Sequence, residues 1–164
     1  MKIAITDANI FIDLIRLELL GYLFNLGMEI HTTREVYDQL NSHQREVAAG
    51  FVQAGVLSVY SFSSQELEEI ELLECPAGLE MADRTVYYYS KRIEALVLSG
   101  DKKLRTFCLN QDIDVRGILW LFDLFLEREL ITKITAVEKL TFLLSFNDRL
   151  PMDQCQQRLN SWGE

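Results

Sequence analysis

Short runs of apolar, often β-branched residues alternate along the chain with longer stretches in which apolar residues recur every three to four positions. The short runs predict buried strands, and the longer stretches predict amphipathic helices that cover them. The expected strands are residues 2–6, 28–32, 56–62, 95–99 and 113–115. The helices expected among them are residues 10–20, 33–40, 42–55, 64–74, 82–92 and a segment that begins near Asp101. Strands separated by helices in this way are typical of a three-layer α/β sandwich with a mainly parallel central sheet.

The last third of the chain has a different pattern, which predicts helices alone. These helices are expected near residues 118–129, 135–147 and 152–161. Capping-box patterns at Ser63 with Glu66 and at Thr135 with Glu138 predict where two of the helices begin. We therefore expect one domain over residues 1–164, with an α/β core over about 1–117 and a helical C-terminal extension over about 118–164.

Composition excludes several classes of protein. With 164 residues, 49% of them apolar, the chain is neither disordered nor collagen-like. Its best apolar run, residues 118–126, is far shorter than a membrane span and contains Asp123. Three cysteines without metal or redox spacing are typical of a reduced protein. We expect a cytoplasmic protein that does not interact with a membrane.

The net charge of −9 bears on how the chain could bind nucleic acid. Proteins that bind nucleic acid through general electrostatic attraction normally carry a basic surface. The charge therefore excludes a generic basic coat. It leaves open a nucleic-acid substrate held by a local basic patch or by bound cations.

Three carboxylates occur where a parallel sheet places its ligands. Asp7 directly follows the first strand, Asp101 comes two residues after strand 95–99, and Asp83 lies at the start of a helix. Ligands of such sheets bind beyond the carboxyl ends of the strands. Carboxylates gathered without basic partners suit Mg²⁺ or Mn²⁺. The alternative is that Asp7 and Asp101 only cap helices and that Asp83 only interacts with a helix dipole.

Several segments together resemble one known family. They are Asp7-Ala8-Asn9-Ile10-Phe11-Ile12-Asp13-Leu14, Ala82-Asp83, Leu98-Ser99-Gly100-Asp101-Lys102-Lys103-Leu104-Arg105, Val115-Arg116-Gly117-Ile118-Leu119-Trp120 and Asn147-Asp148-Arg149-Leu150-Pro151. In order and spacing they resemble the PIN domain family of metal-dependent nucleases, which includes the VapC toxins of bacterial toxin–antitoxin pairs. The last two segments resemble a branch of that family with a helical C-terminal extension.

The resemblance implies roles for individual residues. Asp7, Asp83 and Asp101 would form an acidic catalytic pocket that binds one or two Mg²⁺ or Mn²⁺ ions, which would polarise the scissile phosphate and activate water. Asn9 and Ser99 match positions whose polar side chains steady this pocket, and plain helix capping is the alternative for Asn9. Asp13 also matches a motif position, but on a helix it is expected to be solvated or paired locally.

One position departs from the family pattern. The family usually has a fourth acid, in a Glu-Leu pair on the helix after the second strand, and this chain has Gln39 before Leu40. Gln39 retains a carbonyl oxygen but lacks the charge, so metal affinity is expected to be lower. Of the nearby acids, Glu35 is the better substitute, because residues four apart share a helix face, whereas Asp38 points about 100° away.

The expected partners follow from these features. Lys102 and Arg105 come after Asp101 on the same helix and are candidate contacts for RNA phosphates, although a solvated helix face explains them as well. The acidic helix at 64–74 is either a solvated face or a surface for a small basic antitoxin protein. A homodimer is a further expectation.

The favoured function is a Mg²⁺- or Mn²⁺-dependent ribonuclease, the toxin of a toxin–antitoxin pair being one candidate role. The first alternative is a catalytically degenerate PIN domain that binds protein or RNA, which Gln39 favours. The second alternative is an unrelated α/β domain whose acids are only helix caps.

Overall fold

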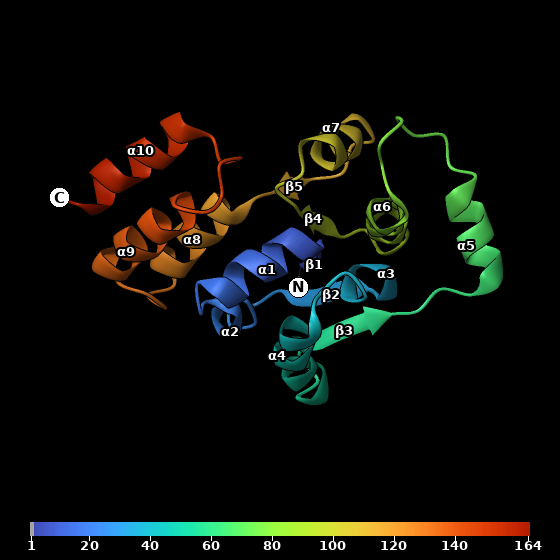
Figure 1. Cartoon of the computed structure of the whole chain (residues 1–164), viewed down its shortest axis with the longest axis horizontal. Helices are drawn as coiled ribbons and strands as arrows, with labels where there is room; N and C mark the ends of the chain where they lie inside the picture. Colours follow the sequence, from blue (N-terminus) through green and yellow to red (C-terminus); the bar gives the residue numbers. More distant parts are fainter. Residues whose placement is uncertain (1) are drawn as a thin grey trace.

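The computed structural model describes residues 2–164 and contains a five-stranded sheet in which every neighbouring pair is parallel (Figure 1). The strands are β1 (Ile3–Thr6), β2 (Glu29–Thr33), β3 (Leu57–Tyr60), β4 (Leu96–Leu98) and β5 (Val115–Arg116), in the order β3-β2-β1-β4-β5. The chain builds the sheet outward from β1 through β2 to β3 and then returns to the other side of β1. The switch in strand order therefore lies between β1 and β4, where ligands bind in such sheets.

Helices cover both faces of this sheet. They are α1 (Ala8–Arg16), α2 (Leu20–Leu23), α3 (Arg34–Tyr37), α4 (Ser42–Gln53), α5 (Ser64–Glu71), α6 (Met81–Ile93), α7 (Lys102–Asn110), α8 (Ile118–Glu127), α9 (Lys133–Leu144) and α10 (Met152–Trp162). Right-handed crossovers place α1 and α4 on one face and α6 and α7 on the other, and each of these two pairs is in contact. The expected three-layer α/β sandwich is thus confirmed.

The C-terminal helices pack against the start of the chain. Phe125 on α8 lies 6.1 Å from Tyr22 on α2 between ring centroids, and Phe122 lies 5.8 Å from Trp162 on α10. The guanidinium of Arg16 lies 3.7 Å from the ring centroid of Phe146.

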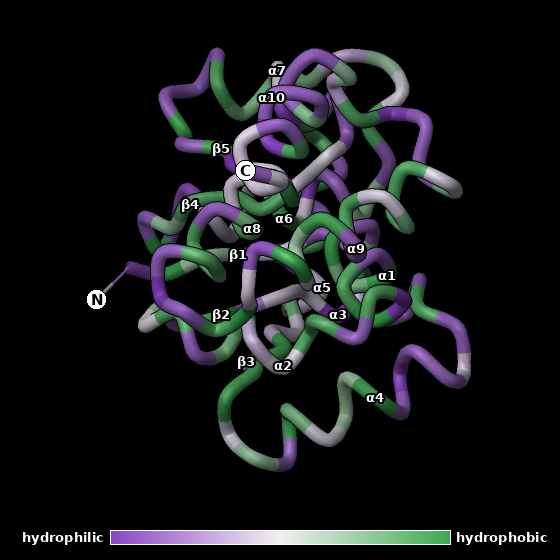
Figure 2. Tube along the Cα trace, turned by 90° about the vertical axis from the view of Figure 1, so that its left-hand side faces the viewer, coloured by the Kyte–Doolittle hydropathy of each residue, from purple (hydrophilic) through white to green (hydrophobic). Residues whose placement is uncertain are grey.

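Helices α8–α10 gather at one end of the molecule and α5 lies at the other (Figure 1). One hydrophobic cluster includes residues from Ala4 to Trp162, and Figure 2 shows hydrophobic and hydrophilic stretches alternating along the chain.

Several boundaries differ from those expected by a few residues, and three of the differences have a clear local cause. The helix expected over residues 10–20 ends at Arg16, because Glu18 adopts a left-handed conformation with φ 59°. The amide of Leu19 then donates to Leu14 O at 2.8 Å and that of Glu18 to Ile15 O at 3.0 Å, which is a Schellman motif with Glu18 in the position that glycine usually occupies. This break lets the buried Leu17 and Leu19 both reach the core.

The other two differences concern helix starts and ends. Helix α9 begins at Lys133, since Thr132 rather than Thr135 is the cap and its Oγ1 accepts from the Thr135 amide at 3.1 Å. Helix α3 ends at Tyr37, short of the expected residue 40. By contrast, the capping box of Ser63 and Glu66 is confirmed, with both reciprocal hydrogen bonds present.

No helix within residues 2–164 is both long and apolar enough to cross a membrane. Cys75, Cys108 and Cys155 are free thiols.

Candidate active site

Asp7 is a buried carboxylate at the carboxyl end of β1, where it caps α1. Its Oδ1 accepts a hydrogen bond from the Ile10 amide at 3.1 Å, and its Oδ2 accepts one from Ser99 Oγ at 2.5 Å. The residue is only 5% exposed. Burial is the main cause that raises the pKa of Asp7 to about 6, although the hydrogen bonds from Ser99 and Ile10 lower it, and the charges of Asp83 and Asp101 raise it further.

Ser99 connects Asp7 to Asp101. Its buried hydroxyl donates to Asp7 and accepts from the Asp101 amide at 3.0 Å. Asp101 in turn caps α7, because its Oδ1 accepts from the amides of Lys103 at 2.8 Å and Leu104 at 3.3 Å. The two carboxylates therefore lie at the carboxyl ends of β1 and β4, on either side of the switch point. Asp7 and Asp101 do cap helices, as one alternative expected. Each cap hydrogen bond also fixes the orientation of its carboxylate, so capping is compatible with metal binding by the same side chain.

Asp83 approaches the same place from α6. It lies in the first turn of that helix and accepts a hydrogen bond from the Glu80 amide at 3.2 Å. Burial is the main cause that raises the pKa of Asp83, with the charges of Asp101 and Glu80 adding to it. The structure thus brings Asp7, Asp83 and Asp101 close enough to influence one another electrostatically. Within residues 2–164 no Lys or Arg forms an ion pair with any of the three.

The donor chemistry of this acidic site (Asp7, Asp83 and Asp101) suits a hard divalent cation. Within the described chain, however, no three His, Cys, Asp or Glu side chains are gathered so as to hold an ion by themselves. Mg²⁺ commonly keeps several waters and binds proteins through one or two carboxylates. Carboxylates that raise one another's pKa and lack a basic partner fit that mode of binding.

The structure separates Glu35 from Gln39. Glu35 lies in the first turn of α3, and its Oε1 is buried with no hydrogen-bond partner among residues 2–164. It lines a cavity of about 760 Å³ together with Glu80 and Arg84, next to the start of α6. Gln39 is exposed in the turn that follows α3. Because the helix ends at Tyr37, Glu35 and Gln39 do not share a helix face, contrary to the expectation. Glu35 nevertheless lines a cavity with residues of α6, the helix that carries Asp83.

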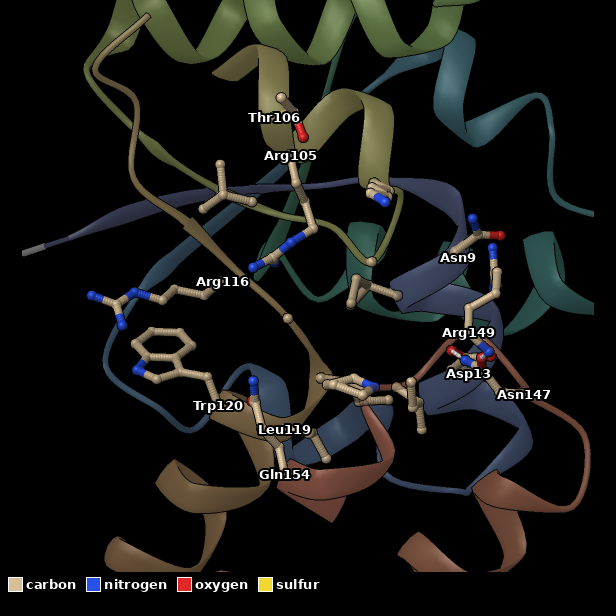
Figure 3. A pocket seen from close by; sticks show the side chains of 18 of the residues that line it. Asn9, Asp13, Arg105, Thr106, Arg116, Leu119, Trp120, Asn147, Arg149 and Gln154 are labelled. Atoms are coloured by element: carbon tan, nitrogen blue, oxygen red, sulfur yellow. Dashed lines mark hydrogen bonds between the residues drawn. The ribbon is translucent and has the colours of Figure 1, made fainter. Parts of the chain in front are cut away.

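A second cavity, of about 510 Å³, adjoins the acidic site and contains the other predicted residues (Figure 3). Asn9 lines this cavity and makes no side-chain hydrogen bond to the three carboxylates. Lys102 lines it as an exposed cation. Arg105 also lines it, but its Nη1 donates to Ser99 O at 2.9 Å, so this guanidinium holds the turn between β4 and α7 in place. Of the two predicted phosphate contacts, Lys102 is therefore the one whose side chain makes no hydrogen bond or ion pair within residues 2–164.

Asp13 and Asn147 form a buried hydrogen-bonded pair in the wall of this cavity, which no sequence pattern predicts. Asp13 is 8% exposed, and its Oδ2 accepts a hydrogen bond from Asn147 Nδ2 at 2.9 Å. Burial raises the pKa of Asp13, and the hydrogen bond from Asn147 and the charge of Arg149 oppose that rise. The expectation that Asp13 is solvated or paired locally was wrong, since its partner is 134 residues away. The signal in the sequence was the segment from Asn147 to Pro151, which resembles the family, but no local pattern pairs it with Asp13.

The sequence of the chain matches a known protein family. A family model described as DUF3368, PIN domain, matches residues 3–164. A solved structure of a PilT N-terminus domain protein from the hyperthermophilic archaeon Sulfolobus solfataricus P2 shares 16% identity, with a TM-score of 0.46, over 73% of this chain and 89% of that one. No curated protein matches the chain.

Proposed function

The chain belongs to the PIN domain family, and on that premise we propose that it is a Mg²⁺- or Mn²⁺-dependent ribonuclease. The observation that carries the proposal is the hydrogen-bonded unit of Asp7, Ser99 and Asp101 at the switch point, with Asp83 electrostatically coupled to it. Family membership also removes the alternative of an unrelated domain whose acids serve only as caps.

The acidic site supplies what phosphodiester hydrolysis requires. Asp7, Asp83 and Asp101 would hold the divalent cation, with Glu35 as a further candidate acid. A bound cation of this kind stabilises charge on the scissile phosphate and lowers the pKa of water. Asp7, with a pKa near 6, is mostly ionised at neutral pH and so can accept such an ion without a large proton cost.

Other residues fix the geometry of the carboxylates. Ser99 donates to Asp7 Oδ2 and accepts from the Asp101 amide, and the amides at the start of α1 and α7 donate to Asp7 Oδ1 and Asp101 Oδ1. Because these groups already occupy hydrogen-bonded positions, little reorganisation is needed when a phosphate approaches. The positive ends of the two helix dipoles offset part of the negative charge that gathers there.

A nuclease assay tests the proposal. Mixed RNAs incubated with the wild-type chain and Mn²⁺ are expected to be cleaved, and Asp7→Asn is expected to remove the cleavage. The matched control is Asp112→Asn, which removes the same charge from an exposed turn between α7 and β5, where the left-handed φ of 61° also suits asparagine. Equal cleavage by wild type and Asp7→Asn would show that the activity does not arise from this site.

A degenerate PIN domain that binds RNA or protein is the second candidate. The exposed Gln39 in place of the usual acid favours it. That candidate predicts RNA or protein binding with no cleavage at any Mn²⁺ concentration, and binding that survives Asp7→Asn.

The toxin role would require a small antitoxin, and a basic one would suit the acidic α5. Two of its acids are already engaged, because Glu66 pairs with Arg92 and Glu69 accepts from Tyr88. Glu68 and Glu71 are the carboxylates left to meet such a partner. Co-purification of the chain with the product of an adjacent gene tests this role, and sizing of the isolated chain tests the expected homodimer.

A further inference from the structure

The cavity beside the acidic site has walls from two distant parts of the chain. Its core wall includes Asn9 and Lys102, and its other wall comes from the C-terminal extension, including Asn147 and Arg149. A volume of about 510 Å³ lies in the range of pockets that take small organic ligands. Figure 3 shows Asn9, Asp13, Asn147 and Arg149 gathered at one side of the pocket, with Arg116 and Trp120 at the other.

The cations of this pocket differ in whether they are already paired. Arg158 forms an ion pair with Asp123 at 2.7 Å, and Arg116 pairs with Asp114 at 3.1 Å. Within residues 2–164, Lys102, Arg105 and Arg149 form no ion pair. Arg105 donates to Ser99 O, and the charge of Arg149 acts on the buried Asp13, which leaves Lys102 and Arg149 as the cations at the cavity whose side chains have no direct ion-pair or hydrogen-bond partner in the described chain. In a chain of net charge −9, cations gathered around one cavity mark a local site for an anion.

Arg149 is held in position by buried polar contacts. Asn147 Nδ2 donates to the buried Asp13, and Asn147 Oδ1 accepts from the Arg149 amide at 3.0 Å. Asn147 is itself buried. These contacts fasten the loop after α9 to α1, so the guanidinium of Arg149 projects from a fixed backbone rather than from a free loop.

The opposite side of the pocket offers a surface for a flat ring. Trp120 is half-buried, and the guanidinium of Arg116 lies 5.5 Å from its ring centroid. Leu119 and Pro151 contribute apolar surface to the same cavity. Nucleobases stack on aromatic rings and on arginine planes irrespective of their sequence.

We infer that this pocket binds one nucleotide of a single-stranded RNA, with the phosphate on Lys102 and Arg149 and the base against Trp120. The assignment of the nucleotide to RNA rests on the proposed ribonuclease function. The pocket adjoins the acidic site, because Gly100, which lies between Ser99 and Asp101, lines it, and Arg105 of its wall donates to Ser99 O. A strand whose nucleotide occupies the pocket would therefore pass a neighbouring phosphate over Asp7 and Asp101.

The test is calorimetric titration of the full chain in EDTA with the four ribonucleoside monophosphates, the matching nucleosides and inorganic phosphate. We expect the monophosphates to bind more tightly than either part alone, since phosphate and base contacts act together. Arg149→Gln is expected to weaken monophosphate binding about tenfold. The control Arg45→Gln removes the same charge from the exposed face of α4, outside the pocket, and is expected to leave the dissociation constant unchanged.

A second variant separates the two halves of the site. Trp120→Ala is expected to weaken monophosphate binding about fivefold or more, since base stacking contributes about 1–3 kcal/mol by alanine substitution. It should leave the binding of inorganic phosphate unchanged. Melting temperatures of all variants, measured in the same buffer, show whether each one is folded.

The outcomes distinguish a failure of the nucleotide pocket from a failure of the ribonuclease proposal. Equal monophosphate affinities for Arg149→Gln and Arg45→Gln, or phosphate that binds as tightly as the monophosphates, would overturn the nucleotide pocket even if the chain cleaves RNA. Monophosphate binding that depends on Arg149 and Trp120, in a chain that never cleaves RNA, would support the pocket and overturn the ribonuclease.

Discussion

The charge of Asp7 should make the protein less stable at neutral pH than in mild acid. Its carboxyl has a pKa of about 6 in the folded chain, against an ordinary value of 3.8. Below pH 3.8 the group is protonated in both states and has no effect. As the pH rises toward 6, the unfolded chain loses this proton while the folded chain keeps it, so the free energy of unfolding falls. Above pH 6 the loss is complete.

The size of this loss follows from the two pKa values. At about 1.36 kcal/mol for each pKa unit, the difference between 3.8 and about 6 corresponds to about 3 kcal/mol. Asp7→Asn removes the charge and keeps an oxygen that can accept from the Ile10 amide. About 0.5 kcal/mol of this is already present at pH 4, so its advantage over wild type is expected to grow by about 2.4 kcal/mol between pH 4 and pH 7.5, with most of the change below pH 6.5.

Urea unfolding in EDTA, followed by circular dichroism at half-unit steps of pH, measures this advantage. Asp112→Asn, which changes an exposed acid, should follow the wild-type curve. Added Mn²⁺ should reduce the advantage of Asp7→Asn, because a cation stabilises the ionised carboxylate of the wild type. A stability difference that does not vary with pH, or a loss of stability in Asp7→Asn at pH 7.5, would refute the reasoning.

Further predictions concern the metal, the helix after β2, the RNA contact and the C-terminal loop. Millimolar Mn²⁺ should raise the melting temperature of wild type by mass action and raise that of Asp101→Asn much less; equal shifts would contradict a shared site. Glu35→Gln should weaken Mn²⁺ binding in calorimetry if Glu35 supplies the missing acid, whereas Gln39→Glu, exposed beyond α3, should change it little; the reverse result would place Gln39 at the metal. Lys102→Gln should reduce the slope of log affinity against log salt for single-stranded RNA by about 0.7, measured in EDTA, and an unchanged slope would exclude this phosphate contact. Asn147→Ala should lower the free energy of unfolding in urea by about 1–3 kcal/mol, since it leaves a buried carboxylate unpaired, and a neutral effect would show that this carboxylate finds water instead.

The sequence by itself determined the class of fold and the main acids. Apolar runs and helical periodicity act over a few residues, so they located all five strands and every described helix except the four-residue α2. Asp7 and Asp101 could be identified because parallel strands bring their carboxyl ends to one edge of the sheet. The capping box of Ser63 was equally local, since its two partners are three residues apart.

Only the tertiary structure decided how the site is supported. The bridge from Ser99 to Asp7 spans 92 residues, and the bond between Asp13 and Asn147 spans 134. The packing of the C-terminal extension on α1 and α2 brings the second pair together, and no local pattern encodes it. The break at Glu18 has the same origin, because burial of the leucines beside it outweighs the cost of a left-handed residue. Local preferences thus set the elements, and contacts between distant segments set which polar groups meet.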